Sequence, residues 1–172
     1  EALAPDAASP FPVRVPAPFL AAMNPGDPAD PVLRQVLASE DERALTPGFS
    51  ADPLEEQAHS PVPGLLHKYQ NRALLITTGA CAVHCRYCFR RHYPYSEGHS
   101  GGAQLPAALA YLERETDIEE VILSGGDPLM LDDEKLAALL TALEALPHLK
   151  RVRLHSRTPV VLPQRITGAL VD

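Results

Sequence analysis

All three cysteines of the 172-residue chain, Cys81, Cys85 and Cys88, lie in one short segment. An odd number of cysteines cannot pair off internally, so this group is not a disulfide framework. Three thiolates on one loop suit a cubane iron–sulfur cluster, because they bind three of its four irons and leave one iron open to another ligand. The spacing therefore predicts an iron–sulfur centre whose chemistry takes place at the open iron.

Zinc is the alternative metal for this segment. His92 follows Cys88 by four positions, so the three cysteines and this histidine could together form a closed tetrahedral zinc site. Such a site would stabilise a binding module, which is a different class of function from catalysis. The local spacing is compatible with both metals, so the choice depends on what surrounds the segment.

Composition indicates a folded, acidic domain. The chain is 45% hydrophobic and 22% charged, and its length is sufficient for one domain with a core. A net charge of −7 argues against nucleic acid as a partner. The sequence shows no long apolar run and no charged-then-apolar leader, so we expect no membrane association. Unpaired, clustered thiols are typical of the reducing cytoplasm, which is the expected location.

Residues 1–63 are predicted to be a proline-rich N-terminal arm that wraps a core. This region holds twelve of the eighteen prolines, which prevents long helices or strands from forming there. One short helix is expected from Pro31 to Leu37, with Asp30 as its cap and Pro31 at its first position.

Residues 64–172 show the alternating pattern of an α/β fold. Apolar runs at 73–78, 120–123 and 152–155 predict strands, whereas leucines at helical spacing predict helices at 105–112 and 133–146. Asp132 is the expected cap of the second helix and Pro147 its end. A third helix is expected within 163–171. Strands and helices that alternate in this way predict a parallel sheet.

This order places the polar motifs at one edge of the sheet. The cysteines follow the first strand, the turn Ser124-Gly125-Gly126-Asp127 follows the second, and His155-Ser156-Arg157 follows the third. The carboxyl ends of parallel strands form the active-site face of (βα) barrels. A zinc knuckle would need no such alignment, which favours the iron–sulfur interpretation.

The same motifs resemble those of known enzymes. Cys-x3-Cys-x2-Cys after a strand, Tyr87 before the third cysteine, and Gly125-Gly126-Asp127-Pro128 resemble the radical S-adenosylmethionine (SAM) superfamily. Residues 66–72, 85–91, 124–129 and 155–157 are similar to the lysine 2,3-aminomutase family. Residues 47–49, 52–56, 63–69 and 90–95 are similar to its EpmB branch, which serves elongation factor P. The resemblance implies a partial parallel (βα) TIM-like barrel, truncated after about three βα units.

The resemblance also implies cofactors and their ligands. A [4Fe–4S] cluster would be held by Cys81, Cys85 and Cys88, and its open iron would bind SAM, which one electron cleaves to a 5′-deoxyadenosyl radical. The contacts to SAM would be Tyr87, Ser124, Gly125, Gly126, Asp127, His155, Ser156 and Arg157. The phosphate of pyridoxal 5′-phosphate (PLP) would be bound by Lys68, Tyr69 and Arg72, and the substrate carboxylate by Arg90.

The implied activity is conversion of L-lysine to β-lysine, for attachment to elongation factor P by a separate ligase. The electron would come from a reductant such as flavodoxin or ferredoxin. A radical SAM aminomutase for another amino acid, such as glutamate, is the alternative enzyme. The chain has only three lysines, Lys68, Lys135 and Lys150, and none suits the PLP Schiff base. We therefore expect the chain to be an N-terminal portion that aggregates or associates and is inactive by itself.

Overall fold

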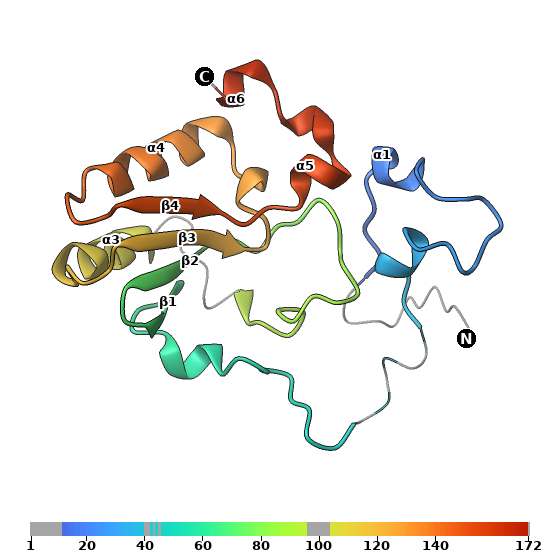
Figure 1. Ribbon diagram of the computed structural model, residues 1–172, viewed down its shortest axis with the longest axis horizontal. Helices are drawn as coiled ribbons and strands as arrows, with labels where there is room; N and C mark the ends of the chain where they lie inside the picture. The colour runs from blue at the N-terminus through green and yellow to red at the C-terminus, as the bar shows by residue number, and fades with distance from the viewer. Residues whose placement is uncertain (1–11, 40–41, 43, 45, 96–103, 172) are drawn as a thin grey trace. The chain divides into compact units, whose positions relative to one another are not determined.

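The computed structural model describes residues 12–39, 42, 44, 46–95 and 104–171. Its centre is a four-stranded sheet whose strands pair in chain order, namely β1 (Leu65–Tyr69), β2 (Arg72–Thr78), β3 (Glu120–Gly125) and β4 (Arg151–Leu154). β1 is antiparallel to β2, whereas β2, β3 and β4 are parallel. Figure 1 shows this open sheet with the helices α3 (Leu105–Arg114) and α4 (Asp133–Glu144). The predicted α/β class with a parallel, partial barrel sheet is confirmed.

The described residues form two compact units. The first, here called the sheet unit, spans residues 54–80 and 93–157. The second, the arm unit, combines described residues up to Pro53 with Cys81–His92 and Thr158–Val171. The division of the chain at residue 63 stays a prediction. The structure adds that residues of the arm pack with two segments that lie far away in the sequence.

One face of the sheet carries a continuous row of buried apolar side chains. Ala73 and Leu75 of β2 stand beside Val121 and Leu123 of β3, and all four side chains are almost fully buried. The connections from β2 to β3 and from β3 to β4 contain α3 and α4, and right-handed crossovers place both helices on one face of a sheet. These helices bury the residues Ala108, Leu112, Leu136, Leu139 and Leu143. This face is the core of the sheet unit.

The predicted third helix is shorter than expected. Within 163–171, the structure has the 3-10 turn η6 (Pro163–Arg165) and the short helix α6 (Gly168–Val171), and a further short helix, α5 (Thr158–Val161), precedes them. Proline disfavours helical backbone at the residue before it, and Leu162 has φ −143° and ψ 65°, so Pro163 separates α5 from η6. The break within 163–171 lies at Ile166, whose φ of −87° and ψ of 89° are not helical.

The helix expected over Pro31–Leu37 is also shorter than predicted. Only the 3-10 turn η1 (Leu33–Gln35) forms. Asp30 nevertheless caps it, because its carboxylate accepts the backbone N–H groups of Val32 and Leu33, both at 2.8 Å. The other short elements are α1 (Ala17–Leu20), η3 (Glu56–His59) and η5 (Pro128–Met130).

The second helix and the last strand lie close to their predicted positions. α4 follows Asp132, but that side chain makes no capping bond and accepts the Nζ–H of Lys135 at 2.6 Å instead. The helix ends at Glu144, so Leu146 lies beyond it. β4 begins and ends one residue earlier than the predicted 152–155, and β1 was not predicted. In the described part of the chain, no helix has the length and apolar character to cross a membrane.

Candidate functional site

The glycine turn after β3, Ser124–Asp127, is bonded to the backbone that follows β2. The N–H of Gly126 donates to the carbonyl of Thr78 at 2.7 Å, and the N–H of Asp127 donates to that of Ala80 at 2.8 Å. A Cβ atom on Gly126 would lie 2.3 Å from the carbonyl oxygen of Ala80. Glycine is therefore required by the close approach of two backbone segments.

Two further features shape this turn. Gly125 has a φ of 110°, a conformation that residues with a Cβ rarely adopt. The hydroxyl of Tyr95 donates to the carbonyl of Gly125 at 2.9 Å, and its ring would contact a Cβ on Gly79 at 3.0 Å. Sequence reasoning gave Tyr95 no role, because nothing local connects it with a turn thirty positions away.

The carboxylate of Asp127 joins the ends of β3 and β4. This buried group accepts the hydroxyl of Ser156 at 2.7 Å and the N–H of Arg157 at 2.8 Å. It also accepts the N–H of Leu129 at 3.0 Å, which caps η5. The structure thus brings together the glycine turn and the segment 155–157, as the strand order predicted.

The cysteine segment, Cys81–His92, contains turns and bends but neither a helix nor a strand. Its three thiols form no disulfide with one another, and all three are partly buried. Burial, the largest cause, raises the pKa of the Cys88 thiol. In the described residues, no three His, Cys, Asp or Glu side chains converge to hold a single metal ion. The thiolates of a four-iron cluster bind separate corners of a cube, so they do not share one central ion.

The apolar anchor of this segment is Val83. It packs in a small buried group with Phe19 of α1, Val36 and Val161 of α5. Cys85 is partly buried and packs against the same group. The arm and the segment after β4 thus supply the core beneath the cysteines.

The arm also forms hydrogen bonds with the cysteine segment, through Pro12, Arg14 and Gln35. His84 donates its N–H to the carbonyl of Arg14 at 3.0 Å, and its ring Nδ1 lies 2.7 Å from the carbonyl of Pro12. The guanidinium of Arg14 donates to the carbonyl of Cys81 at 3.2 Å. Farther along, the N–H of Arg86 donates to the carbonyl of Gln35 at 2.8 Å.

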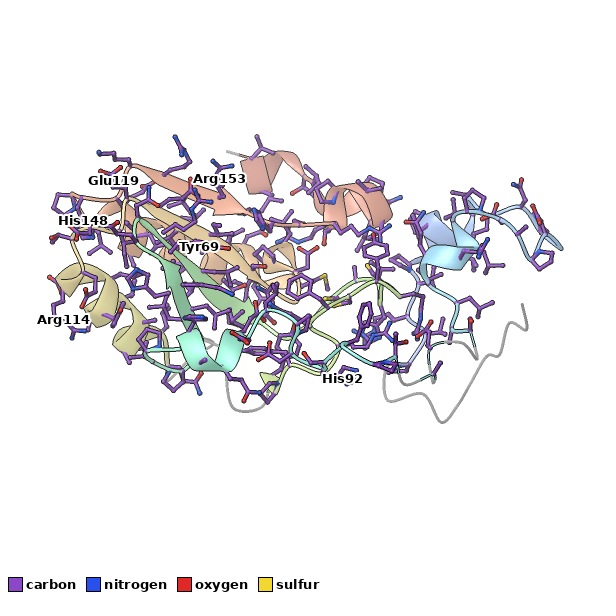
Figure 2. All side chains as sticks on the ribbon, turned by 60° about the horizontal axis from the view of Figure 1, so that its bottom comes forward. Tyr69, His92, Arg114, Glu119, His148 and Arg153 are labelled. Carbon is purple, nitrogen blue, oxygen red and sulfur yellow. The ribbon has the colours of Figure 1, made fainter. Side chains whose placement is uncertain are left out.

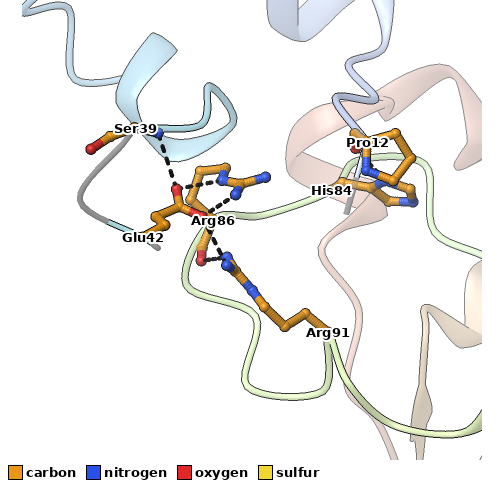
Figure 3. A network of polar contacts seen from close by, with 6 residues as sticks. All are labelled: Pro12, Ser39, Glu42, His84, Arg86 and Arg91. Carbon is orange, nitrogen blue, oxygen red and sulfur yellow. Dashed lines mark hydrogen bonds and ion pairs between the residues drawn. The ribbon is translucent and has the colours of Figure 1, made fainter. Parts of the chain in front are cut away.

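Glu42 makes the charged contact between the arm and the cysteine segment (Figure 3). Its carboxylate accepts both the Nε and the Nη2 of Arg86, the former at 2.8 Å, and the Nη1 of Arg91 at 2.8 Å. Burial is the largest influence on the pKa of Glu42 and would raise it. The hydrogen bonds from Arg86 and Arg91 outweigh burial and lower this pKa to about 2.

The other predicted residues of the arm unit lie in different environments. Tyr87 is 64% exposed, whereas Arg90 is buried and its guanidinium carbon lies 4.7 Å from the centroid of the Phe89 ring. His92, labelled in Figure 2, is exposed. Neither environment identifies a ligand, so the assignments of Tyr87 to SAM and of Arg90 to substrate stay predictions.

The residues assigned to the PLP phosphate lie at the opposite end of β2 from the glycine turn. Tyr69 and Arg72 are paired across the β1–β2 hairpin, and the Arg72 guanidinium carbon is 5.9 Å from the centroid of the Tyr69 ring. The Nζ of Lys68 donates to the carbonyl of Leu54 at 2.9 Å. At about 3.3 Å per residue, the length of β2 separates Arg72 from Thr78 by about 20 Å.

Arg72 belongs to a charged cluster that sequence reasoning missed. The carboxylate of the buried Glu120 accepts Arg151 Nη1 at 2.9 Å and Arg153 Nε at 3.0 Å. Arg72 Nε lies 3.7 Å from its other oxygen, and Arg153 is labelled in Figure 2. The hydrogen bond from Arg151 is the largest cause that lowers the pKa of Glu120. Three guanidinium groups around one carboxylate leave an excess of positive charge on this face of the sheet.

Comparison with known families decides the chemistry of the cysteine segment. The family model described as the radical SAM superfamily matches residues 75–171, which include all three cysteines, the glycine turn and the segment 155–157. The chain belongs to the radical SAM superfamily. Membership implies a [4Fe–4S] cluster and SAM, and the three thiols on one loop are the donor set that such a cluster needs.

Curated relatives give a closer similarity. The chain is 59% identical over 162 residues to the L-lysine 2,3-aminomutase of Escherichia coli (strain K12), which covers 94% of this chain and 47% of the relative. It is 52% identical to the L-lysine 2,3-aminomutase of Haemophilus influenzae, over 91% of this chain and 46% of the relative. That of Clostridium subterminale is 41% identical, with 90% and 37% covered. The chain thus spans about half the length of the relatives it matches, or less.

Proposed function

We propose that this chain carries the cluster- and SAM-binding part of an L-lysine 2,3-aminomutase, an isomerase that converts L-lysine to β-lysine. The observation that carries the proposal is 59% identity, over nearly the whole chain, to a relative of that name, together with the intact Cys81, Cys85 and Cys88 motif. In the proposed enzyme, the cluster and SAM supply the radical that starts the reaction.

Within this proposal, the sheet unit orients SAM. The glycine turn is fixed to the backbone of Thr78 and Ala80, and Asp127 fixes the segment 155–157 beside it. Both segments lie at the carboxyl ends of parallel strands, where barrel enzymes bind their ligands. We assign Tyr87, Ser124, Gly125, Gly126, Asp127, His155, Ser156 and Arg157 to the SAM site.

The charged cluster supports PLP as the further cofactor. A phosphate dianion is matched by guanidinium groups, and Arg72 lies in a group whose positive charges exceed its negative charge. We therefore place the PLP phosphate against Lys68, Tyr69 and Arg72, and the substrate carboxylate against Arg90. PLP stabilises the migrating radical when it is bound.

The lysine that would form the PLP Schiff base is proposed to lie outside this chain. Each of the three lysines has a partner elsewhere: Lys68 bonds Leu54, Lys135 bonds Asp132, and Lys150 pairs with Glu119. Glu119 lies where β3 begins, at the edge of the sheet remote from the glycine turn (Figure 2). Substrate-ammonium carboxylates are proposed to come from the same outside region.

The proposed biological role is to supply β-lysine, which a separate ligase attaches to elongation factor P. The proposed location is the cytoplasm, and the proposed electron donor is flavodoxin or ferredoxin. The support is the similarity of segments 47–49, 52–56, 63–69 and 90–95 to the EpmB branch. This role is tested by incubating elongation factor P with its ligase and the reaction product. Mass spectrometry should then show that elongation factor P has gained the mass of one β-lysyl group.

The enzymatic proposal is tested with the full-length protein after anaerobic reconstitution with iron and sulfide. With SAM, PLP, a reductant and L-lysine, we expect β-lysine, detected by chromatography of the derivatised amino acids. Conversion of glutamate but not lysine would favour the alternative aminomutase. A colourless protein that holds zinc and cleaves no SAM would favour the binding module and contradict the proposal.

A further inference from the structure

The cysteine segment is built of turns and bends. A helix or strand would satisfy its own backbone groups, but the described residues 81–92 form neither. Its own backbone contributes bonds from the N–H of Cys88 to the carbonyl of Cys85, at 3.1 Å, and from the N–H of Arg91 to the carbonyl of Cys88, at 3.4 Å. Its geometry must therefore depend strongly on bonds to other parts of the arm unit.

Backbone contacts hold the first half of the segment. Arg14 forms hydrogen bonds with Cys81 and His84, and Gln35 forms one with Arg86. Val83 is buried in the small apolar group. These contacts fix Cys81 and the approach to Cys85. Beyond Arg86, the arm gives the segment further support through the side chain of Arg91.

Glu42 supplies that support through charge. Arg86 precedes Cys88 by two positions and Arg91 follows it by three, and the carboxylate of Glu42 accepts hydrogen bonds from both guanidinium groups (Figure 3). Arg91 also donates through Nη2 to the carbonyl of Arg86, which closes the loop around Cys88. Arg86 and Arg91 are largely buried, with 8% and 18% of their side chains exposed, so their charges are poorly screened.

We propose that Glu42 is a positioning residue for the cluster loop, an inference that rests on the proposed function. Its carboxylate fixes Arg86 and Arg91 on the two sides of Cys88 and offsets their positive charge. The potential of an iron–sulfur cluster depends on the charge and hydrogen bonds around it. Glu42 thereby keeps the cluster potential low, which favours electron transfer from the cluster to SAM, and it keeps the third thiolate in place.

Glu42→Gln tests this role in the full-length, reconstituted protein, because it removes the charge with little change in shape. We expect iron loss to a chelator to become about ten-fold faster, as expected when a charge-assisted contact is removed. We also expect the midpoint potential of the cluster to rise. This potential is measured by a redox titration monitored through the visible absorbance of the cluster. Glu42→Asp, which keeps the charge, should leave the potential close to that of the wild type.

Two further proteins make the test specific. Glu144→Gln makes the same chemical change at an exposed position of α4 and should alter neither iron loss nor potential. Arg91→Gln should also accelerate iron loss, and the double variant with Glu42→Gln should be less impaired than the two effects added together, because both variants break one contact.

The outcomes separate this inference from the proposed function. A wild-type protein that binds a cluster, with a Glu42→Gln variant that retains iron and potential unchanged, would overturn the positioning role alone. Fully additive effects of Glu42→Gln and Arg91→Gln would overturn it too. A wild-type protein that takes up no cluster would overturn the proposed function and, with it, the role of Glu42.

Discussion

The cysteine loop and the glycine turn receive their positions from different sources. The glycine turn extends a strand, and its bonds run to the neighbouring strand ends through Thr78, Ala80 and Asp127. The cysteine loop has no regular structure, and bonds from Arg14, Gln35 and Glu42 of the arm hold it. A metal-binding loop supported by an irregular arm depends on individual contacts, whereas a turn on a parallel sheet depends on the packing of the whole sheet.

The largest effect should come from the cysteines themselves. Cys88→Ala removes a thiolate that no neighbouring residue replaces, so we expect complete loss of SAM cleavage and strong loss of iron in the full-length protein. His92→Ala is the matched control and should retain the iron, measured by colorimetric assay. If His92→Ala loses iron as fully as Cys88→Ala does, His92 is a ligand and the cluster assignment is wrong.

The second effect concerns the sheet-held turn. In Gly126→Ala the new methyl group would lie 2.3 Å from the carbonyl oxygen of Ala80, and neither backbone segment can move without breaking its bonds. We expect a loss of about 1–3 kcal/mol in the free energy of unfolding, measured by denaturant titration. Gly168→Ala is the control, since nothing lies within 4 Å of its added methyl group. Equal stability of the two variants would refute the packing role of Gly126.

The third prediction tests the other end of the same sheet. Arg72→Ala should weaken PLP binding by about ten- to a hundred-fold, the loss expected when one charge-assisted contact to phosphate is removed. Iron content should not change. Arg114→Ala, which removes a mostly exposed guanidinium from α3, is the control. Unchanged PLP affinity in Arg72→Ala, measured by fluorescence titration, would refute the phosphate assignment.

The smallest effect is the acid sensitivity of the arm-held loop. Glu42 has a pKa of about 2 in the folded protein against 4.5 ordinarily, so its contribution to stability is present above pH 4.5 and is lost as the pH falls toward 2. The contribution should be only about 1 kcal/mol, because a quarter of the Glu42 side chain is exposed and solvent weakens its interactions. The stability of wild type and Glu42→Gln should therefore converge between pH 4.5 and 2. A constant difference across that range would contradict the assignment.

The sequence predicted the sheet unit better than the arm unit, for physical reasons. Apolar runs such as 73–78 and 120–123 record burial within a few residues, and a parallel sheet then places the ends of its strands at one edge. The bonds of Asp127 to Ser156 and Arg157 follow from that order. The contact of Glu42 with Arg86 and Arg91 joins residues more than forty positions apart, and no local pattern records it.

The corrected details show the same distinction. The third helix is interrupted at Ile166, whose backbone is not helical, and the sequence carries no proline or glycine at that residue to mark the break. The cluster of Glu120 with Arg72, Arg151 and Arg153 depends on the strand register, which aligns residues 72, 120 and 151 side by side. Register cannot be read from one strand alone, so the sequence did not reveal this cluster.

The most direct test of the account is the electron paramagnetic resonance spectrum of the reduced, reconstituted full-length protein, recorded with and without SAM. Three protein thiolates leave one iron open, so we expect a [4Fe–4S]⁺ signal whose shape changes when SAM binds that iron. The change should disappear in Cys81→Ala. A protein without such a signal, or a cluster spectrum that SAM leaves unchanged, would contradict the claim that this chain holds a SAM-binding cluster.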